Sequence, residues 1–125
     1  MAHLEHVNIT VTDPEKTAHM LCEIFGWDIR WNGPSGMGGY TYHVGSADDY
    51  VAVYTKDGAP AGDGRTGSLK GGLNHVGITV DDLDVTIERV KSAGFEPFNF
   101  GDYEPGRRFY FLDQDGIEFE VVCYG

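Results

Sequence analysis

The sequence has few cysteines and no long apolar run. Cys22 and Cys123 are the two cysteines among its 125 residues, too few for a disulfide framework. We interpret both as buried free thiols, which favours a reducing cytoplasm. No stretch approaches the roughly 18–20 apolar residues of a membrane span, and residues 1–15 lack the basic start and apolar run of a secretory signal. We therefore expect no membrane partner.

Basic residues are also scarce. Nine Lys and Arg against twenty Asp and Glu give a formal net charge of −11. A chain of this charge repels nucleic acid and anionic lipid unless a local basic patch intervenes. Arg107 and Arg108 form the only adjacent basic pair, and we expect both side chains to be solvated. Nucleic acid is therefore not an expected partner.

What the sequence does contain is an internal repeat. Residues 4–13 and 73–82 are identical at seven of ten positions, at an offset of 69 residues. Such a repeat indicates duplication of a structural unit. Six glycines among the seventeen residues 56–72 predict a flexible linker. We therefore predict a single domain, 1–125, with a first module over 1–55 and a second over 73–125.

Each copy begins with a strand and continues with a helix. Alternation of β-branched and polar residues from position 7 to 11 and from 76 to 80 has the period of a strand with one polar face. Asp13 and Asp82 then serve as helix N-caps, Asp13 being followed by Pro14. In the second helix the apolar positions are Val85, Ile87, Val90 and Ala93. Short β-like runs follow at 27–31, 40–44, 50–55, 96–100, 108–112 and 118–124. The pattern predicts an α+β fold of two β-α-β-β-β modules.

Three side chains are candidate metal ligands. His6 and His75 hold equivalent places on the polar faces of the two first strands, and Glu120 lies between apolar neighbours in the last strand. Two imidazoles and one carboxylate are the donor set typical of Fe(II), and Mn, Zn or Ni accept similar sets. Alternatively, the histidines are remnants of duplication with no present role.

The paired Leu-x-His-Val-x-Ile-Thr-Val starts and the ending from Arg108 to Glu120 resemble the vicinal-oxygen-chelate superfamily. That group includes glyoxalase I, extradiol dioxygenases, fosfomycin-resistance transferases and bleomycin-resistance proteins. The ending is similar to the family pattern F-Y-F-x-D-P-D-G-x-x-x-E, with Gln114 where proline is usual. The resemblance implies an eight-stranded open cup, glyoxalase-like, with one divalent metal (Fe, Mn, Ni or Zn) on His6, His75 and Glu120. The family's fourth ligand position falls at or near Val53, which cannot bind a metal.

The resemblance implies a divalent-metal-dependent enzyme acting on a small oxygenated substrate, and a homodimer. The missing fourth ligand is unlike glyoxalase I, and extradiol dioxygenases carry further histidines that residues 98–108 lack. Both a glyoxalase-like lyase or isomerase and an extradiol-type dioxygenase therefore stay open. Tyr110 is the catalytic candidate, as hydroxyl donor to a metal-bound oxygen, unless it only packs in the cup wall. The alternative function is non-catalytic drug sequestration of the bleomycin-resistance type.

Overall fold

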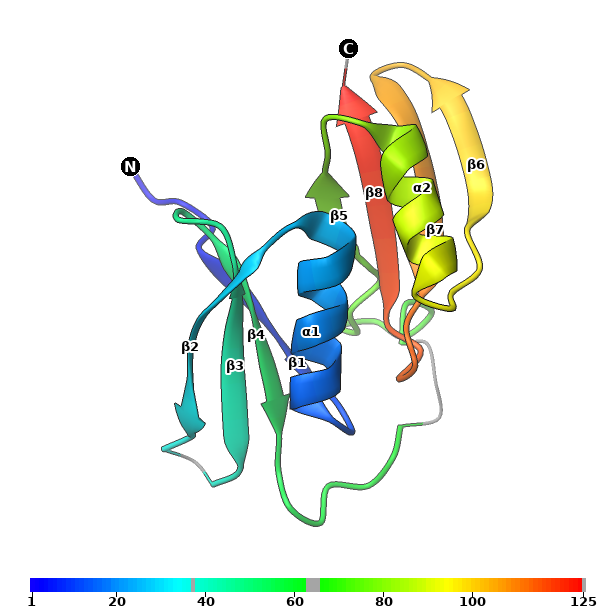
Figure 1. Cartoon of the computed structure of the whole chain (residues 1–125). Helices are drawn as coiled ribbons and strands as arrows, with labels where there is room; N and C mark the ends of the chain where they lie inside the picture. The colour runs from blue at the N-terminus through cyan, green and yellow to red at the C-terminus, as the bar shows by residue number, and fades with distance from the viewer. Residues whose placement is uncertain (37, 63–65, 125) are drawn as a thin grey trace. The chain divides into compact units, whose positions relative to one another are not determined.

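A computed structural model describes residues 1–36, 38–62 and 66–124 (Figure 1). The chain forms two compact units that divide between Ala61 and Gly62, inside the predicted linker, of which residues 63–65 lie outside the described part. The first module contains β1 (His6–Thr10), α1 (Pro14–Phe25), β2 (Asp28–Pro34), β3 (Tyr40–Gly45) and β4 (Tyr50–Thr55). The second contains β5 (Val76–Thr79), α2 (Leu83–Ser92), β6 (Phe98–Tyr103), β7 (Gly106–Leu112) and β8 (Glu118–Tyr124).

The two modules have the same topology. The strand order is β1-β4-β3-β2 in one sheet and β5-β8-β7-β6 in the other. In each, the first strand pairs in parallel with the last, and the remaining pairs are antiparallel. The predicted α+β class and the two β-α-β-β-β modules, eight strands together, are confirmed. Neither helix of the described chain has the length and apolar character that a membrane crossing requires.

The helix α1 begins where the sequence predicts. The Asp13 carboxylate accepts a hydrogen bond from the Lys16 amide at 3.1 Å, and Pro14 fills the first turn. Gly26 adopts a left-handed φ of 70° and donates its N–H to the Cys22 carbonyl, which closes the last turn. The buried side of α1 consists of Thr17, Ala18, Met20, Leu21 and Ile24.

The predicted apolar face of α2 is partly wrong. Val85 is 44% exposed, whereas Leu83, Thr86 and Val90 are buried. These three have the spacing of one helix face. Thr86 is buried without loss of a hydrogen bond because its hydroxyl donates to the Asp82 carbonyl at 2.9 Å.

Both cysteines are free but only half-buried, so their interpretation as buried thiols is corrected. Cys22 lies at the edge of the buried side of α1, and Cys123 comes near the end of β8, where its thiol contacts the Asp81 carbonyl at 3.5 Å. Burial, with Asp28 and Glu23 nearby, still raises the pKa of the Cys22 thiol.

The end of the predicted linker forms a turn closed by hydrogen bonds. The Thr66 hydroxyl donates to the Leu73 carbonyl at 2.7 Å, and the Gly72 amide donates to the Leu69 carbonyl at 2.9 Å. A Cβ at Gly72 would lie 2.3 Å from the Thr66 carbonyl oxygen, so the turn requires glycine there. This turn leads directly into the residues that precede β5.

Candidate metal site

The alternation of β7 and β8 places three polar side chains on one face of the second sheet. Phe109, Phe111, Phe119 and Val121 are fully buried on the opposite face. Arg108 and Tyr110 therefore share the face that carries Glu120, and Tyr110 pairs with Glu120 across the ladder. The Glu120 side chain is 14% exposed, so its charge is largely removed from solvent.

One oxygen of Glu120 is held by two donors. The Tyr110 hydroxyl donates to Oε2 at 2.7 Å, and Arg108 Nη1 donates to the same atom at 3.1 Å. Burial alone would raise the pKa of Glu120, but these two hydrogen bonds and the nearby positive charge outweigh it and lower that pKa. The hydrogen bond to Glu120, reinforced by burial, raises the pKa of Tyr110 to about 12. Glu120 is therefore an anion and Tyr110 a neutral donor.

The other oxygen of Glu120 faces His75. The distance from Glu120 Oε1 to His75 Nε2 is 3.3 Å. His75 Nδ1 lies 2.7 Å from Asn74 Oδ1, while Asn74 Nδ2 donates to the Gly67 carbonyl at 3.3 Å. Because that second bond fixes the amide orientation, Oδ1 is the acceptor and Nδ1 carries the proton. In the neutral ring, Nε2 then presents a lone pair toward a carboxylate oxygen, an arrangement that fits a bound cation.

A glycine on β5 leaves space beside these two donor atoms. Gly77 pairs with Glu120 across β5 and β8, and a Cβ at Gly77 would lie 3.8 Å from Glu120 Oε1. A larger side chain at this position would extend toward the carboxylate. The glycine therefore leaves room next to the donor pair.

The structure corrects the reading of one basic residue. Arg108, expected to be solvated, is only 13% exposed and pairs with Glu120. Arg107 is 52% exposed and forms a pair with Asp84 at 3.4 Å, as expected of a surface charge. The alternation with Phe109 and Phe111 was the signal that could have placed Arg108 beside Tyr110.

His6 belongs to the first module and has a similar local setting. Its Nδ1 lies 2.6 Å from Glu5 Oε1, so the preceding residue holds Nδ1 as Asn74 does for His75. The ring stacks on Tyr50 with centroids 4.9 Å apart, and the side chain is 43% exposed. The described residues contain no cluster of three or more His, Cys, Asp or Glu side chains that could hold a metal ion. The second module brings together two, His75 and Glu120.

The strand register identifies the fourth position of the family pattern. Gly77 pairs with Glu120, and its repeat counterpart Asn8 pairs with Ala52. The position is therefore Ala52 rather than Val53, which is fully buried and pairs with Ile9. Alanine, like valine, offers no ligand atom, so the expected gap is retained at the corrected position.

Comparisons with known proteins agree with this architecture. A family model described as the Glyoxalase/Bleomycin resistance protein/Dioxygenase superfamily matches residues 3–121. A glyoxylase/bleomycin resistance protein/dioxygenase domain from Frankia sp. EAN1pec has a similar structure, with a TM-score of 0.83 and 22% identity over 100% of this chain and 99% of that one. No curated protein matches the chain.

Two fosfomycin resistance proteins are also similar in structure. FosX from Listeria monocytogenes has a TM-score of 0.74 and 22% identity, over 100% of this chain and 95% of that one. FosX from Mesorhizobium loti has a TM-score of 0.74 and 23% identity, over 98% and 91%. A mutant of the Listeria protein has been solved in complex with Mn(II) and 1S,2S-dihydroxypropylphosphonic acid. At these sequence identities the similarity shows a shared fold and nothing further.

Proposed function

Because the chain belongs to the glyoxalase/bleomycin resistance protein/dioxygenase superfamily, we propose that it is a divalent-metal-dependent enzyme acting on a small oxygenated substrate. The observation that carries this proposal is the pair of donor atoms, His75 Nε2 and Glu120 Oε1, 3.3 Å apart. Each is turned toward the other by partners on its far side. In a protonated ring the Nε2–H donates to Oε1 at this distance, and in the neutral ring a cation that lies against both atoms takes the place of that proton.

His6 is the proposed third ligand. With His75 and Glu120 it completes the two-histidine, one-carboxylate set that Fe(II) and Mn(II) favour and that Zn and Ni accept. His6 and His75 lie in different modules, so the complete set requires modules that meet within one chain or between two. We expect a homodimer, which permits either pairing. We also expect a reducing cytoplasm, since Cys22 and Cys123 are both free.

A cation at this site supplies a Lewis acid for neighbouring oxygens of a substrate. The protein's own side chains keep Glu120 ionised and fix its orientation. Arg108 and Tyr110 occupy Oε2 and keep the carboxylate ionised, which leaves Oε1 as the coordinating atom. Tyr110 is thereby a positioning residue for Glu120, and its catalytic role as a donor to substrate oxygen stays a prediction. Unchanged turnover of Tyr110→Phe at saturating metal would rule that catalytic role out.

The relatives and the gap at Ala52 narrow the reaction class. The Listeria FosX mutant was solved with Mn(II) and a dihydroxypropyl phosphonate, which supports a metal site that receives neighbouring oxygens. Proton transfer of the glyoxalase type needs a base beside the metal, and Ala52 supplies none. This favours ring-opening dioxygenation or a FosX-like reaction over glyoxalase I chemistry. Oxygen consumption by Fe(II)-loaded protein with catechols distinguishes the first from the others.

The decisive experiment is the metal content of protein purified without chelators or a histidine tag. We expect about one equivalent of metal per site in wild type and its loss in Glu120→Ala. The matched control is Glu88→Ala, which removes an exposed carboxylate paired only with Lys91 in the same module. Absence of metal from wild type even after loading would overturn the proposal. The drug-sequestering alternative would then be favoured, tested by binding of planar drugs to metal-free protein.

A further inference from the structure

We propose that the first module carries a separate binding site for an aromatic carboxylate, formed by Arg30 and Trp31 on β2. The site adjoins His6, whose ring stacks on Tyr50, but it needs neither a metal nor His75 and Glu120. In this site Arg30 binds the carboxylate of the ligand, and Trp31 stacks on its ring.

A β-bulge places the two side chains on the same face. Ile29 pairs with Val44 and Trp31 with His43, so Arg30 is an extra residue with no partner on β3. Consecutive residues of a regular strand point to opposite faces. Here the Arg30 guanidinium carbon lies 4.7 Å from the centroid of the Tyr50 ring, which stacks on His43 at 4.4 Å.

The Trp31 ring belongs to the same group of side chains. Its centroid lies 5.1 Å from that of His43. Arg30, Trp31, His43 and Tyr50 therefore form one continuous cluster, which we call the bulge cluster. The bulge explains how neighbours along the chain both reach it.

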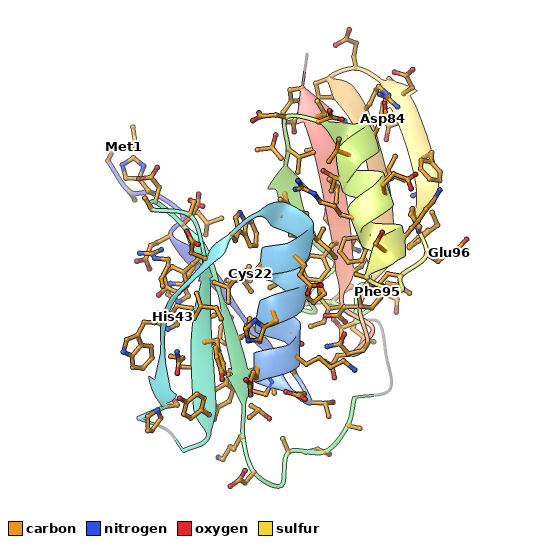
Figure 2. The ribbon with its side chains drawn as sticks, viewed as in Figure 1. Met1, Cys22, His43, Asp84, Phe95 and Glu96 are labelled. Carbon is orange, nitrogen blue, oxygen red and sulfur yellow. The ribbon has the colours of Figure 1, made fainter. Side chains whose placement is uncertain are left out.

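The bulge cluster lies on the sheet face opposite α1. Val44 and Val51, which alternate with His43 and Tyr50, are buried at 0% and 3% exposure. The helix α1 packs against β3 and β4, and it runs along one side of its sheet (Figure 1). Figure 2 labels His43 on β3 and Cys22 on α1. The cluster is therefore not the surface that α1 covers within its own module.

Trp31 presents a flat apolar surface. Its side chain is 49% exposed. A Cβ at Gly33 would lie 2.8 Å from Trp31 Cζ2, so the indole lies against the β2 backbone at a position where only glycine leaves space. One side of the ring rests on the strand and the exposed remainder is available to a ligand. Stacking of an aromatic ring on indole stabilises a complex beyond the effect of the buried area.

Arg30 supplies a cation without an anion. Among the described residues it forms no ion pair, although the chain carries a net charge of −11. Glu5, the acidic group that acts on His43 of the same cluster, lies 2.6 Å from His6 Nδ1. Burial, together with the positive charges of His6 and Arg30, lowers the pKa of His43 despite Glu5. A planar guanidinium in this setting matches the two oxygens of a carboxylate.

The two neighbouring groups define the ligand class. Because Arg30 and Trp31 are consecutive residues on one face, the carboxylate and the ring must be close together in the ligand, as they are in benzoate. A neutral ring would use only Trp31, and an aliphatic acid only Arg30. The preferred ligand is therefore one that has both groups.

The test is titration of the metal-free protein with three probes, followed by NMR of the Trp31 indole and Arg30 side-chain signals. The probes are benzoate, neutral benzamide and non-aromatic cyclohexanecarboxylate. We expect benzoate to bind about tenfold more tightly than either of the others, since each lost contact is worth about 1.4 kcal/mol. Equal affinity for the three probes, or no binding of benzoate, would overturn the proposal.

Substitutions assign the two contacts. Arg30→Gln should abolish the preference for benzoate over benzamide, and Trp31→Leu the preference over cyclohexanecarboxylate. The matched control Arg89→Gln removes an exposed arginine of α2 in the other module and should change neither. Benzoate affinity that survives Arg30→Gln in a protein with well-dispersed spectra would contradict the assignment. Because no metal is present, failure here is distinguishable from failure of the proposed enzyme function.

Discussion

Tyr110 and Glu120 face each other across the β7–β8 ladder, with the Tyr110 hydroxyl 2.7 Å from Glu120 Oε2. This bond fixes one carboxylate oxygen and leaves the other directed at His75. Outer partners of metal ligands typically change affinity by about 10–100-fold when they are removed. If the proposed metal site is correct, Tyr110 should therefore have a measurable effect on metal affinity whatever the reaction is.

Tyr110→Phe should weaken metal binding by about tenfold, because Oε2 loses a donor and Glu120 gains rotational freedom. Isothermal titration with Mn(II) measures the change. Tyr124→Phe is the control, since Tyr124 is 59% exposed and lies at the end of β8. Equal affinities for Tyr110→Phe and wild type would show that Tyr110 does not position Glu120.

Arg108→Met should raise the pKa of Glu120, because it removes both a hydrogen bond and a positive charge that lower it. A lowered folded-state pKa stabilises the fold above the unfolded value of 4.5, and that stability is lost as pH falls through the folded pKa. In Arg108→Met the folded-state pKa is higher, so this stabilisation should be smaller and its loss should be complete at a higher pH. Carboxyl carbon NMR of Glu120 follows the titration. Arg107→Met, which removes an exposed pair with Asp84, should leave the pKa of Glu120 unchanged.

Asn74→Ala should change the tautomer of His75. In wild type the Asn74 amide is oriented to accept from Nδ1, so in the zinc-loaded protein the ring should carry its proton on Nδ1 and coordinate through Nε2. Nitrogen chemical shifts distinguish the two tautomers directly. Without Asn74 the population should move toward the Nε2-protonated form, which cannot coordinate through that atom. A wild-type ring protonated on Nε2 would contradict the fit of the site to a cation.

Much of the fold follows from local patterns. The N-caps Asp13 and Asp82 and the period-two strands predicted both modules, because these signals act within a few residues. The repeat likewise indicated that His6 and His75 hold equivalent positions. Such features need no knowledge of partners distant in the chain.

Register is what the sequence could not supply. The repeat offset is 69 residues between His6 and His75 but 68 between Ala52 and Glu120. A change of one residue moves a strand's side chains to the opposite face, which is why the pairing was needed to place the fourth position, predicted at or near Val53, at Ala52. The bulge at Arg30 could not be predicted from the alternation of residues for the same reason, since only the pairing with β3 reveals the extra residue. Arg108 looked like a surface charge until β8 placed Glu120 beside it.

Asp113→Asn tests the turn that leads into β8. Asp113 is 6% exposed, and its Oδ1 accepts from the amides of Asp115 and Ile117 at 2.9 Å each. Burial, the largest influence, raises the pKa of Asp113 from 3.8 to about 6 although these backbone hydrogen bonds oppose it. Because the folded-state pKa is the higher one, the stabilisation from this carboxyl is complete below pH 3.8 and is lost as pH rises through about 6.

Asparagine keeps the Oδ1 acceptor but does not ionise. The free energy of unfolding of Asp113→Asn, relative to wild type, should therefore increase by about 2–3 kcal/mol between pH 4 and pH 7.5, as two pKa units correspond to that amount. Urea unfolding at both pH values measures this difference. Asp102→Asn, at an exposed position of β6, controls for loss of a negative charge and should show no such pH dependence. A constant difference for Asp113→Asn across this range would mean that the buried carboxyl is ionised at little cost, with its backbone donors compensating fully for burial.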